Sequence, residues 1–374
     1  MNWRLLLVLI LLCLSTAEAL AQQPPESDPV GASQLVSLTW DRSAPPADLY
    51  LMPARTVLGF SRDVTRRYGQ IHLTCLSSTD PADGSCEVNG SDLPLAGPSN
   101  VSIQLTEQRS GLRSEIRAAG YLERVMSGRF CSGDFWLAAK RALNSASWET
   151  CGTDQPLGTG VTLWLPTTEL GKLVAGHWKG KVQIALRVDI NQPAAVSLTL
   201  ELDFVVTDHN AAAIYLPEFG HATPTVGLNL RYDPFAHTLS GSKLVDVCLY
   251  DGLGSQSQYL GLTVRDTSGH APGPTGFSVW HDDGGTDARR RLDYTLTLDH
   301  AGTHVPLVNG LEHQLRNIDS VPLRLVMLPG MTYPVYCVPT PITFVTPVVP
   351  STSKDAGHYG GSLHVELRIP TTSP

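Results

Sequence analysis

The most regular pattern in the chain is an alternation of apolar and polar residues in short segments separated by turn residues. Every second residue is apolar from Val196 to Phe204, and the same alternation runs from Ser362 to Ile369. A period of two places successive side chains on opposite faces of a β-strand, so these segments predict an all-β protein. Other strands are predicted at residues 36–40, 50–60, 70–76, 101–105, 161–165, 181–190, 244–249, 260–264, 277–280, 292–298, 323–328, 333–338 and 342–345.

The last alternating segment predicts a strand at a sheet edge. Gly357–Gly361 forms a turn before it, and Pro370 ends it. Only a short tail follows, so no later strand of the same chain is expected beside it. An apolar edge invites pairing with another chain, whereas an ordinary final strand of a closed sandwich would show the same alternation. On the pattern alone the ordinary strand is favoured. The apolar face consists of Leu363, Val365, Leu367 and Ile369.

One segment has helical periodicity instead. Phe135, Ala138, Ala139 and Ala142 fall near one face of a helix predicted over Asp134–Leu143. A single short helix does not change the predicted fold class.

The first 21 residues have the features of a secretory signal peptide. Arg4 supplies the positive charge, Leu5–Cys13 is apolar, and Ala19–Ala21 is a small-x-small cleavage site. The apolar run is too short to span a membrane, and no later run is long enough. We therefore expect an exported chain that starts near Gln22 and does not insert into the membrane.

The length of the remaining chain suits two domains better than one ordinary β-domain. Leu216–Gly220 interrupts the alternation, which restarts at Val226. The prediction is a first domain over residues 22–216 and a second over residues 217–374. The second contains roughly eight short strands, a spacing that favours an immunoglobulin-like sandwich.

The cysteine content fits an exported protein. Cys13 lies in the predicted signal peptide, and the even number that remains indicates three disulfides. About fifteen pairings are open to six cysteines, and the sequential one is the simplest. That pairing joins Cys75 to Cys86, Cys131 to Cys151, and Cys248 to Cys337.

The residues give little sign of catalysis, metal binding or nucleic-acid binding. A net charge of −8 leaves no global basic field for nucleic acid. The chain has no P-loop, no Gly-x-Ser-x-Gly and no His-Glu-x-x-His. His281–Asp287 lacks the acidic spacing and terminal glutamate of a calcium loop, so a polar hairpin turn is favoured there. We predict no catalytic residue, no metal and no cofactor.

Arginines are unusually frequent between Arg55 and Arg141, which indicates a locally basic face. The planar guanidinium group binds carboxylates and anionic sugars in a bidentate manner. The alternative, which the residue pattern favours, is a set of surface arginines paired with acidic neighbours. Those neighbours are Glu107, Glu115 and Glu123. The aromatic residues available for stacking on sugar rings are Tyr68, Trp136 and Trp148.

Several segments resemble one family of fimbrial proteins. Val247–Ser255 contains Cys-Leu-Tyr-Asp-Gly, which resembles a signature in the pilin domain of tip adhesins and pilus initiators of the alternate chaperone–usher (class 5 fimbrial) pathway. Ile214–Gly220 and Val226–Arg231 resemble that family's passage from adhesin domain to pilin domain. Leu163–Leu173, followed by Gly176–Trp178, resembles the end of its adhesin domain.

The resemblance implies a non-enzymatic protein at the tip of a fimbrium on the bacterial surface. It implies an immunoglobulin-like adhesin domain and an incomplete immunoglobulin-like pilin domain that lacks its last strand. A periplasmic chaperone would lend a strand to the final edge during export through the outer-membrane usher. The donor strand of the major pilin would then replace the chaperone strand.

The resemblance also implies a receptor site built from arginines, because related adhesins use arginines there. Arg66 and Arg67 are the first candidates and Arg187 is the next, with a host glycan or glycoprotein as the receptor. Two alternatives stay open. One is an assembly initiator without receptor binding. The other is a secreted β-sandwich carbohydrate-active enzyme, which needs a pair of carboxylates that no motif nominates.

Overall fold

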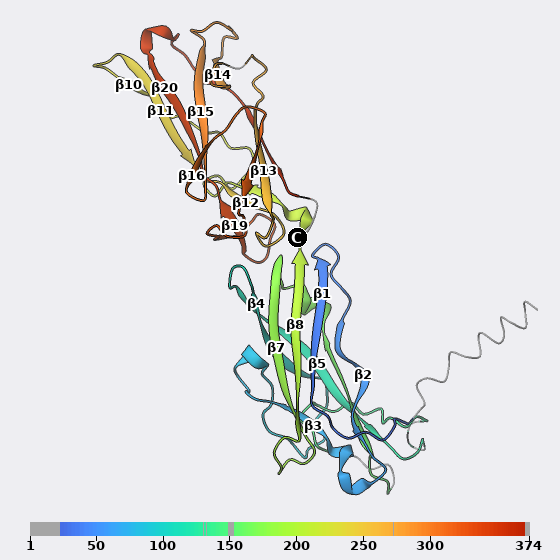
Figure 1. The fold of residues 1–374 in the computed structure, drawn as a ribbon. Helices are drawn as coiled ribbons and strands as arrows, with labels where there is room; N and C mark the ends of the chain where they lie inside the picture. The colour runs from blue at the N-terminus through green and yellow to red at the C-terminus, as the bar shows by residue number, and fades with distance from the viewer. Residues whose placement is uncertain (1–22, 130, 132, 149–152, 272, 371–374) are drawn as a thin grey trace, which may run out of the picture. The chain divides into compact units, whose positions relative to one another are not determined.

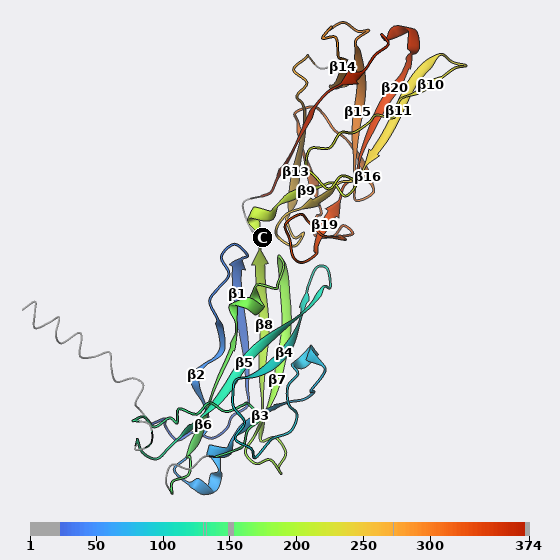
Figure 2. The same ribbon diagram turned by 180° about the vertical axis from the view of Figure 1, so that it is seen from behind.

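The structure is a computed structural model that describes residues 23–129, 131, 133–148, 153–271 and 273–370. The predicted signal peptide lies outside the described residues. The described chain is almost entirely β-strand, as Figures 1 and 2 show from two sides, and the predicted all-β fold class is confirmed.

The chain divides into two compact units. The N-terminal unit comprises residues up to Trp40 together with Ala44–Leu173 and Trp178–Val205. The C-terminal unit comprises Asp41–Ser43, Val174–His177 and the chain from Val206 onward.

The strands of the first part of the chain are β1 (Ala32–Asp41), β2 (Leu49–Phe60), β3 (His72–Cys75), β4 (Ser99–Glu107), β5 (Arg113–Val125), β6 (Gly158–Leu165), β7 (Gly176–Arg187) and β8 (Val196–Thr207). The strands of the second part are β9 (Ala213–Tyr215), β10 (Arg231–Asp233), β11 (Thr238–Val245), β12 (Cys248–Tyr250), β13 (Tyr259–Asp266), β14 (Phe277–His281), β15 (Arg291–His300), β16 (Thr303–Pro306), β17 (Glu312–Arg316), β18 (Arg324–Val326), β19 (Val335–Pro339), β20 (Ile342–Pro350), β21 (Tyr359–Gly360) and β22 (Leu363–Arg368). The described helices are the short α2 (Thr167–Leu170) and the 3₁₀ turns η1 (Val64–Arg66), η2 (Tyr68–Gln70), η3 (Pro81–Asp83), η4 (His209–Ala211) and η5 (Ser351–Ser353).

A single sheet organises the N-terminal unit. Its strands follow the order β1-β8-β7-β4-β5-β6-β2, and β3 pairs with β7 beside this path. The alternation read in the sequence sets the two faces of each strand. In β4, for example, Val101, Ile103 and Leu105 are fully buried, and the residues between them are half-buried.

The predicted helix over Asp134–Leu143 is wrong, because this segment runs extended along β5. Pairing with β4 covers only the first part of β5. Beyond that point Arg141 and Leu122 exchange two backbone hydrogen bonds of 2.8 and 2.9 Å, and the Phe135 carbonyl accepts one from Met126. Satisfying the exposed backbone of β5 outweighs the helical preference of the alanines. No helix among the described residues is long and apolar enough to cross a membrane.

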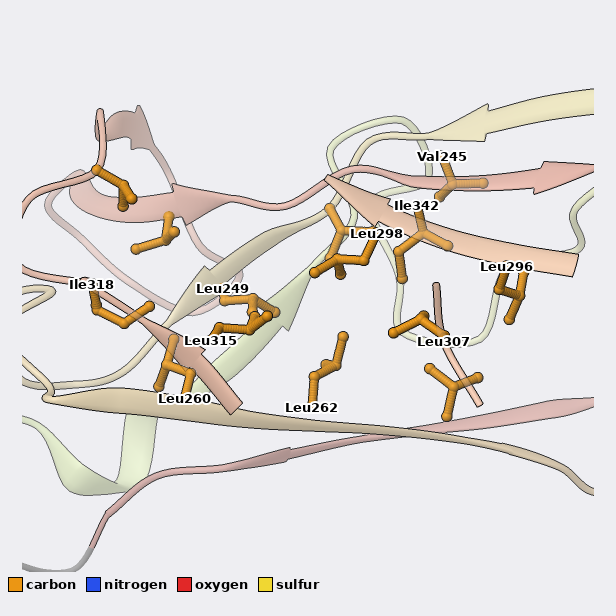
Figure 3. Packing of buried hydrophobic residues seen from close by; sticks show 14 of the residues in the cluster. Val245, Leu249, Leu260, Leu262, Leu296, Leu298, Leu307, Leu315, Ile318 and Ile342 are labelled. Atoms are coloured by element: carbon orange, nitrogen blue, oxygen red, sulfur yellow. The ribbon is translucent and has the colours of Figure 1, made fainter. Parts of the chain in front are cut away.

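Three sheets build the C-terminal unit. One follows the order β10-β11-β20-β15-β14-β21, with β16 beside β15; the second is β18-β19-β12-β9, and the third is β17-β13-β22. Figure 3 shows the buried cluster between them, in which Leu260 and Leu262 of β13 lie with Leu296 and Leu298 of β15. Apolar faces from separate sheets thus share one core, as in a β-sandwich.

The two units separate earlier in the sequence than the predicted boundary between residues 216 and 217. Ala213–Tyr215 pairs with Cys248–Tyr250 and so belongs to a sheet of the C-terminal unit. Backbone pairing therefore includes in this unit a segment that the sequence pattern assigned to the first domain. The functional assignment of each domain stays a prediction.

Two of the sequential disulfides are present. Cys75 is bonded to Cys86, and Cys248 is bonded to Cys337. Cys151, the predicted partner of Cys131, lies outside the described residues. The first bond closes a turn-rich loop beside β3, and the second joins β12 to β19 across a separation of 89 residues.

The Cys-Leu-Tyr-Asp-Gly segment is held by a buried carboxylate. One oxygen of Asp251 accepts the backbone N–H groups of Leu253 and Ser255, both at 2.8 Å. The other oxygen accepts the N–H and hydroxyl of Ser257, at 3.1 and 2.7 Å. Gly252 has a φ of +69°, and a Cβ there would lie 2.3 Å from the Asp208 carbonyl oxygen, so glycine is required. The motif is therefore a buried loop anchor.

Replacing Asp251 by alanine should destabilise the C-terminal unit by about 3 kcal/mol, because several buried donors lose their acceptor at once. Chemical unfolding of the full chain, followed by tryptophan fluorescence and circular dichroism, measures the loss. Glu366→Ala is the control, because Glu366 is an exposed acidic residue of β22. Equal stability of the two variants would contradict the anchoring role.

Candidate functional site

The predicted receptor arginines lie at one end of the N-terminal sheet. Arg66 ends η1, and Arg67 follows it in a left-handed conformation with a φ of +57°. Arg187 is the last residue of β7 and faces His72 in the pairing of β7 with β3. The structure thus brings the predicted residues to the turns that surround β3.

An aspartate outside the predicted set neutralises Arg66. The Arg66 guanidinium is ion-paired with Asp28, and the Tyr68 hydroxyl donates to the same carboxylate at 2.7 Å. The hydrogen bond from Tyr68, together with the charge of Arg66, lowers the pKa of Asp28 below its ordinary value. The Arg66 guanidinium also lies over the Tyr68 ring, at 6.0 Å from its centre. The three side chains form one hydrogen-bonded group.

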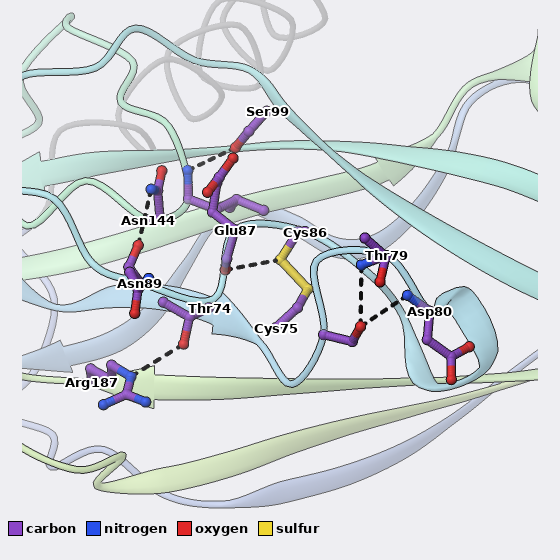
Figure 4. Close-up of a disulfide and its surroundings, with 12 residues drawn as sticks. Thr74, Cys75, Thr79, Asp80, Cys86, Glu87, Asn89, Ser99, Asn144 and Arg187 are labelled. Carbon is purple, nitrogen blue, oxygen red and sulfur yellow. Dashed lines mark hydrogen bonds between the residues drawn. A yellow bond between two sulfur atoms is a disulfide. The ribbon is translucent and has the colours of Figure 1, made fainter.

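Arg67 and Arg187 meet around a second aspartate turn. Arg67 forms an ion pair of 2.6 Å with Asp189. Arg187 donates to the Thr74 hydroxyl at 3.2 Å and to the Gln192 carbonyl at 2.8 Å. Figure 4 shows Arg187 reaching Thr74 beside the disulfide of the adjoining loop. Arg67 is more than half exposed, so its charge stays accessible from solvent.

An open pocket adjoins this end of the unit, and the sequence reasoning did not find it. Its volume is about 620 Å³. Arg62 contributes a guanidinium for which no ion pair is described, and the Ser127 hydroxyl donates to Asp154 at 2.6 Å. The pocket offers one cation, several polar groups and a small apolar floor. Its lining residues are Gln23, Arg62, Val64, Ser127, Thr153, Asp154, Gln155 and Leu157.

The acidic residues proposed as alternative partners of the arginines behave differently from one another. Glu123 is buried and pairs with Arg55 at 3.2 Å. Glu107 is also buried and accepts the backbone N–H groups of Arg109 and Ser110. The carboxylates beside Arg66 and Arg67 come from other parts of the chain, and only folding brings them there.

The final strand has a partner on one side only among the described strands. It pairs with β13 from Gly261↔Arg368 to Asp266↔Leu363. Leu363, Val365, Leu367 and Ile369 pack against the core of the C-terminal unit but stay only half-buried. In the neighbouring β13, by contrast, Leu260, Leu262 and Val264 are at most 2% exposed. The apolar face of β22 is therefore incompletely covered.

A second segment with the same character lies against this core. Val226 and Leu228 are also packed against the cluster and half-buried, and Leu230 is 42% exposed. These residues belong to the segment before β10. The sequence pattern identified both segments as alternating, but it did not show that their apolar faces remain partly open.

The final strand is fastened near its end by a bidentate ion pair. Arg368 donates to both oxygens of Glu312, at 2.7 and 2.5 Å, and to the Tyr259 hydroxyl at 3.1 Å. Glu312 lies on β17, so the contact crosses β13 over Gly261, where a Cβ would come within 2.8 Å of the Glu312 carboxyl carbon. This ion pair joins β22 to the third strand of its sheet.

The segment considered as a calcium loop is a hairpin turn, as favoured by the sequence. It joins β14 to β15, and Asp283 and Asp287 both bind Arg290. Within the described parts of the chain, no group of three or more acidic, histidine or cysteine residues is arranged to hold a metal ion.

Comparisons with known proteins agree with this two-unit architecture. Residues 17–209 match the family model for the first domain of the CFA/I fimbrial protein CfaE, and residues 212–371 match the model for its second domain. The CFA/I fimbrial protein CfaE of Escherichia coli is 29% identical over 312 residues, which cover 80% of each chain.

Two solved structures share the fold. The crystal structure of CfaE, the adhesive subunit of CFA/I fimbria of enterotoxigenic Escherichia coli, has a TM-score of 0.72 at 24% identity and covers 93% of this chain and 95% of that one. A chaperone–tip adhesin complex of CFA/I fimbriae biogenesis has a TM-score of 0.67 at 24% identity, with coverages of 94% and 99%.

The N-terminal unit should lose stability in mild acid because of His72, which faces Arg187 and is fully buried. Burial, helped by Arg124 and Arg187, lowers the pKa of His72 below its ordinary value. A lowered pKa favours the neutral ring in the folded state. The stabilisation is therefore complete above about pH 6.5 and declines as the pH falls below that value.

Thermal unfolding of the full chain at pH 7.5 and pH 5 measures this effect, and we expect the first transition to fall by several degrees. His72→Gln should reduce the difference between the two pH values, whereas the control His364→Gln, at an exposed position of β22, should keep it. An unchanged pH difference in His72→Gln would rule out this origin.

Proposed function

The chain belongs to the CfaE family of CFA/I fimbrial proteins, and on that premise we propose that it is the tip adhesin of a fimbria that also initiates pilus assembly. The proposed route is export through the periplasm with a chaperone, passage through an outer-membrane usher, and display at the fimbrial tip. The C-terminal unit would serve assembly, and the N-terminal unit would bind a receptor on a host or another surface.

The observation that carries the assembly function is the half-covered face of β22. Full burial of an aliphatic side chain contributes roughly 1.5–3 kcal/mol, and four such side chains on this strand are only half-buried. A strand added along the free edge would complete their burial and pair the open backbone groups. We propose that a chaperone strand, and later a donor strand from the major pilin, occupies this edge of the incomplete pilin domain.

The receptor function rests on the group of arginines around β3. Arg66 and Arg67 are exposed, and each holds a carboxylate of the chain itself. A carboxylate or sulfate of a glycan offers the same bidentate chemistry. We propose that Arg66 and Arg67, with Arg187 behind them, contact an anionic glycan or glycoprotein receptor, and that the neighbouring Arg62 pocket widens this surface.

Of the alternatives, an initiator without receptor binding shares the proposed assembly function and differs only in adhesion. The carbohydrate-active enzyme has less support, because the family is one of fimbrial proteins. Turnover of a glycan by the purified chain would favour the enzyme.

A donor peptide fused after Pro374 should stabilise the C-terminal unit. We expect its thermal midpoint to rise by roughly 10 °C or more, since the peptide buries apolar area that is now half-exposed. Differential scanning calorimetry of the mature chain, with and without the peptide, measures the shift.

The matched control is the same peptide with its apolar residues replaced by serine, which keeps the length and the backbone. A further control is Val365→Asp in the fused chain, which should remove most of the gain. A mature chain that is monomeric and no more stable when fused would argue against the open edge.

Replacing Arg66 and Arg67 by alanine should lower adhesion at least about tenfold, because two exposed cations of the proposed site are lost. Adhesion of the full chain to host cells, and its binding to immobilised glycans, measure the effect. Arg113→Ala is the control, since Arg113 is an exposed cation of β5.

The thermal midpoint should change by no more than about 2 °C, because exposed ion pairs contribute little to stability. Unchanged adhesion of a folded double variant would remove these residues from the site. Adhesion absent even from the unaltered chain would favour the initiator without receptor binding.

A further inference from the structure

A row of aromatic side chains crosses three neighbouring strands on the outer face of the N-terminal sheet. Trp164 of β6 faces Tyr50 of β2 on one side and Ala119 of β5 on the other. Tyr50 and Trp164 have ring centres 6.4 Å apart, and Tyr121 of β5 meets Trp164 edge to face at 5.8 Å. Figure 2 shows the strands β2, β6 and β5 that carry the row.

These rings face solvent and not the core. Leu163 and Leu165, on either side of Trp164, are at most 1% exposed, so Trp164 occupies the opposite face of β6. Tyr50 is 52% exposed, while its neighbour Leu51 is fully buried. Large aromatic residues kept on a solvent face are enriched at binding surfaces, because they offer much contact area at a small entropic cost.

The row is held rigid at one end. Gly97 lies directly against Tyr121, since a Cβ at this position would come within 2.8 Å of the Tyr121 Cβ. The Lys140 ammonium lies over the Tyr121 ring, 4.2 Å from its centre. Tyr121 is thus fixed between backbone, Lys140 and Trp164, and the exposed rings are presented without much freedom to lose on binding.

The charge beside the row is positive. Lys140 is exposed, and no carboxylate is paired with its ammonium in the part of the chain that the structure describes. An ammonium held over an aromatic ring keeps its remaining donors for an anion. A ligand that complements both features has an apolar ring face for Tyr50 and Trp164 and a negative group for Lys140.

We propose that Tyr50, Trp164 and Lys140 form a binding site for an acidic glycan, in which a pyranose ring stacks on the aromatic side chains and a carboxylate or sulfate pairs with Lys140. Tyr121 positions Trp164 and Lys140. The site is separate from the arginine group, which follows the far end of β2: Tyr50 lies near the start of that strand, and its length is roughly 30 Å. The proposal rests on the proposed adhesion function and adds a second contact site to it.

Titration of the full mature chain with 3′-sialyllactose, lactose 3′-sulfate and neutral lactose tests the site, with the fluorescence of Trp164 as one readout and calorimetry as the other. The anionic sugars should bind at least about tenfold more tightly than lactose. Comparison of the two anionic sugars shows whether a carboxylate or a sulfate is preferred. Equal binding of all three would overturn the role of Lys140.

Variants separate the two parts of the site. Tyr50→Ser should raise the Kd for every sugar at least about tenfold, and Lys140→Gln should raise it for the anionic sugars only. Lys140→Arg should keep the anionic preference. Leu35→Ser, at an exposed apolar residue of β1, is the control for the loss of surface area. An unchanged Kd in folded Tyr50→Ser would overturn the proposal.

Cell adhesion distinguishes failure of this site from failure of the proposed function. If the unaltered chain adheres and Tyr50→Ser adheres equally well, the aromatic row is not a contact site, and the adhesion function stands. If the unaltered chain adheres to no surface, the adhesion function itself fails. If Tyr50→Ser loses adhesion while no sugar binds the unaltered chain, the ligand is not a glycan, and the proposal is overturned.

Discussion

The antiparallel pairing of β22 with β13 is the interaction on which the use of the C-terminal unit depends. It places four apolar side chains over the core, and among the described strands it leaves the other edge of β22 without a partner. Arg368 and Glu312 fasten the strand across β13, so the edge is held in position before any partner arrives. An acceptor strand that is fixed in advance loses little conformational freedom on pairing, which favours the addition of an incoming strand.

Buried polar groups hold the irregular parts of both units. Asp251 gathers the loop after β12, and in the N-terminal unit the buried Arg124 donates to the carbonyls of Ile71 and Ser145 and to Thr159. Burial lowers the pKa of Arg124 to about 9. Such groups are costly to leave unpaired, so each fixes the loops that satisfy it. The turns that carry the candidate receptor arginines adjoin this framework, since Ile71 lies between η2 and β3.

The candidate receptor surface is not a free patch of positive charge. Asp28 and Asp189 occupy Arg66 and Arg67, so an anionic ligand there exchanges one carboxylate for another. Arg62 at the pocket and Lys140 at the aromatic row differ, because no ion pair is described for either side chain. Specific binding at the arginine group then depends on geometry more than on charge, whereas the aromatic row combines an uncompensated cation with exposed ring faces.

The sequence alone determined the fold class, the family resemblance and the strands with strong alternation, because a period of two is a local property of the chain. It also nominated Arg66, Arg67 and Arg187, whose role stays a prediction. Tertiary structure decided what local pattern cannot encode. Residues 134–143 run extended because β5 offers unpaired backbone there, and Ala213–Tyr215 joins the C-terminal unit by pairing with β12. The aspartates beside the arginines and the row from Tyr50 to Tyr121 are likewise contacts between distant segments, and only folding creates them.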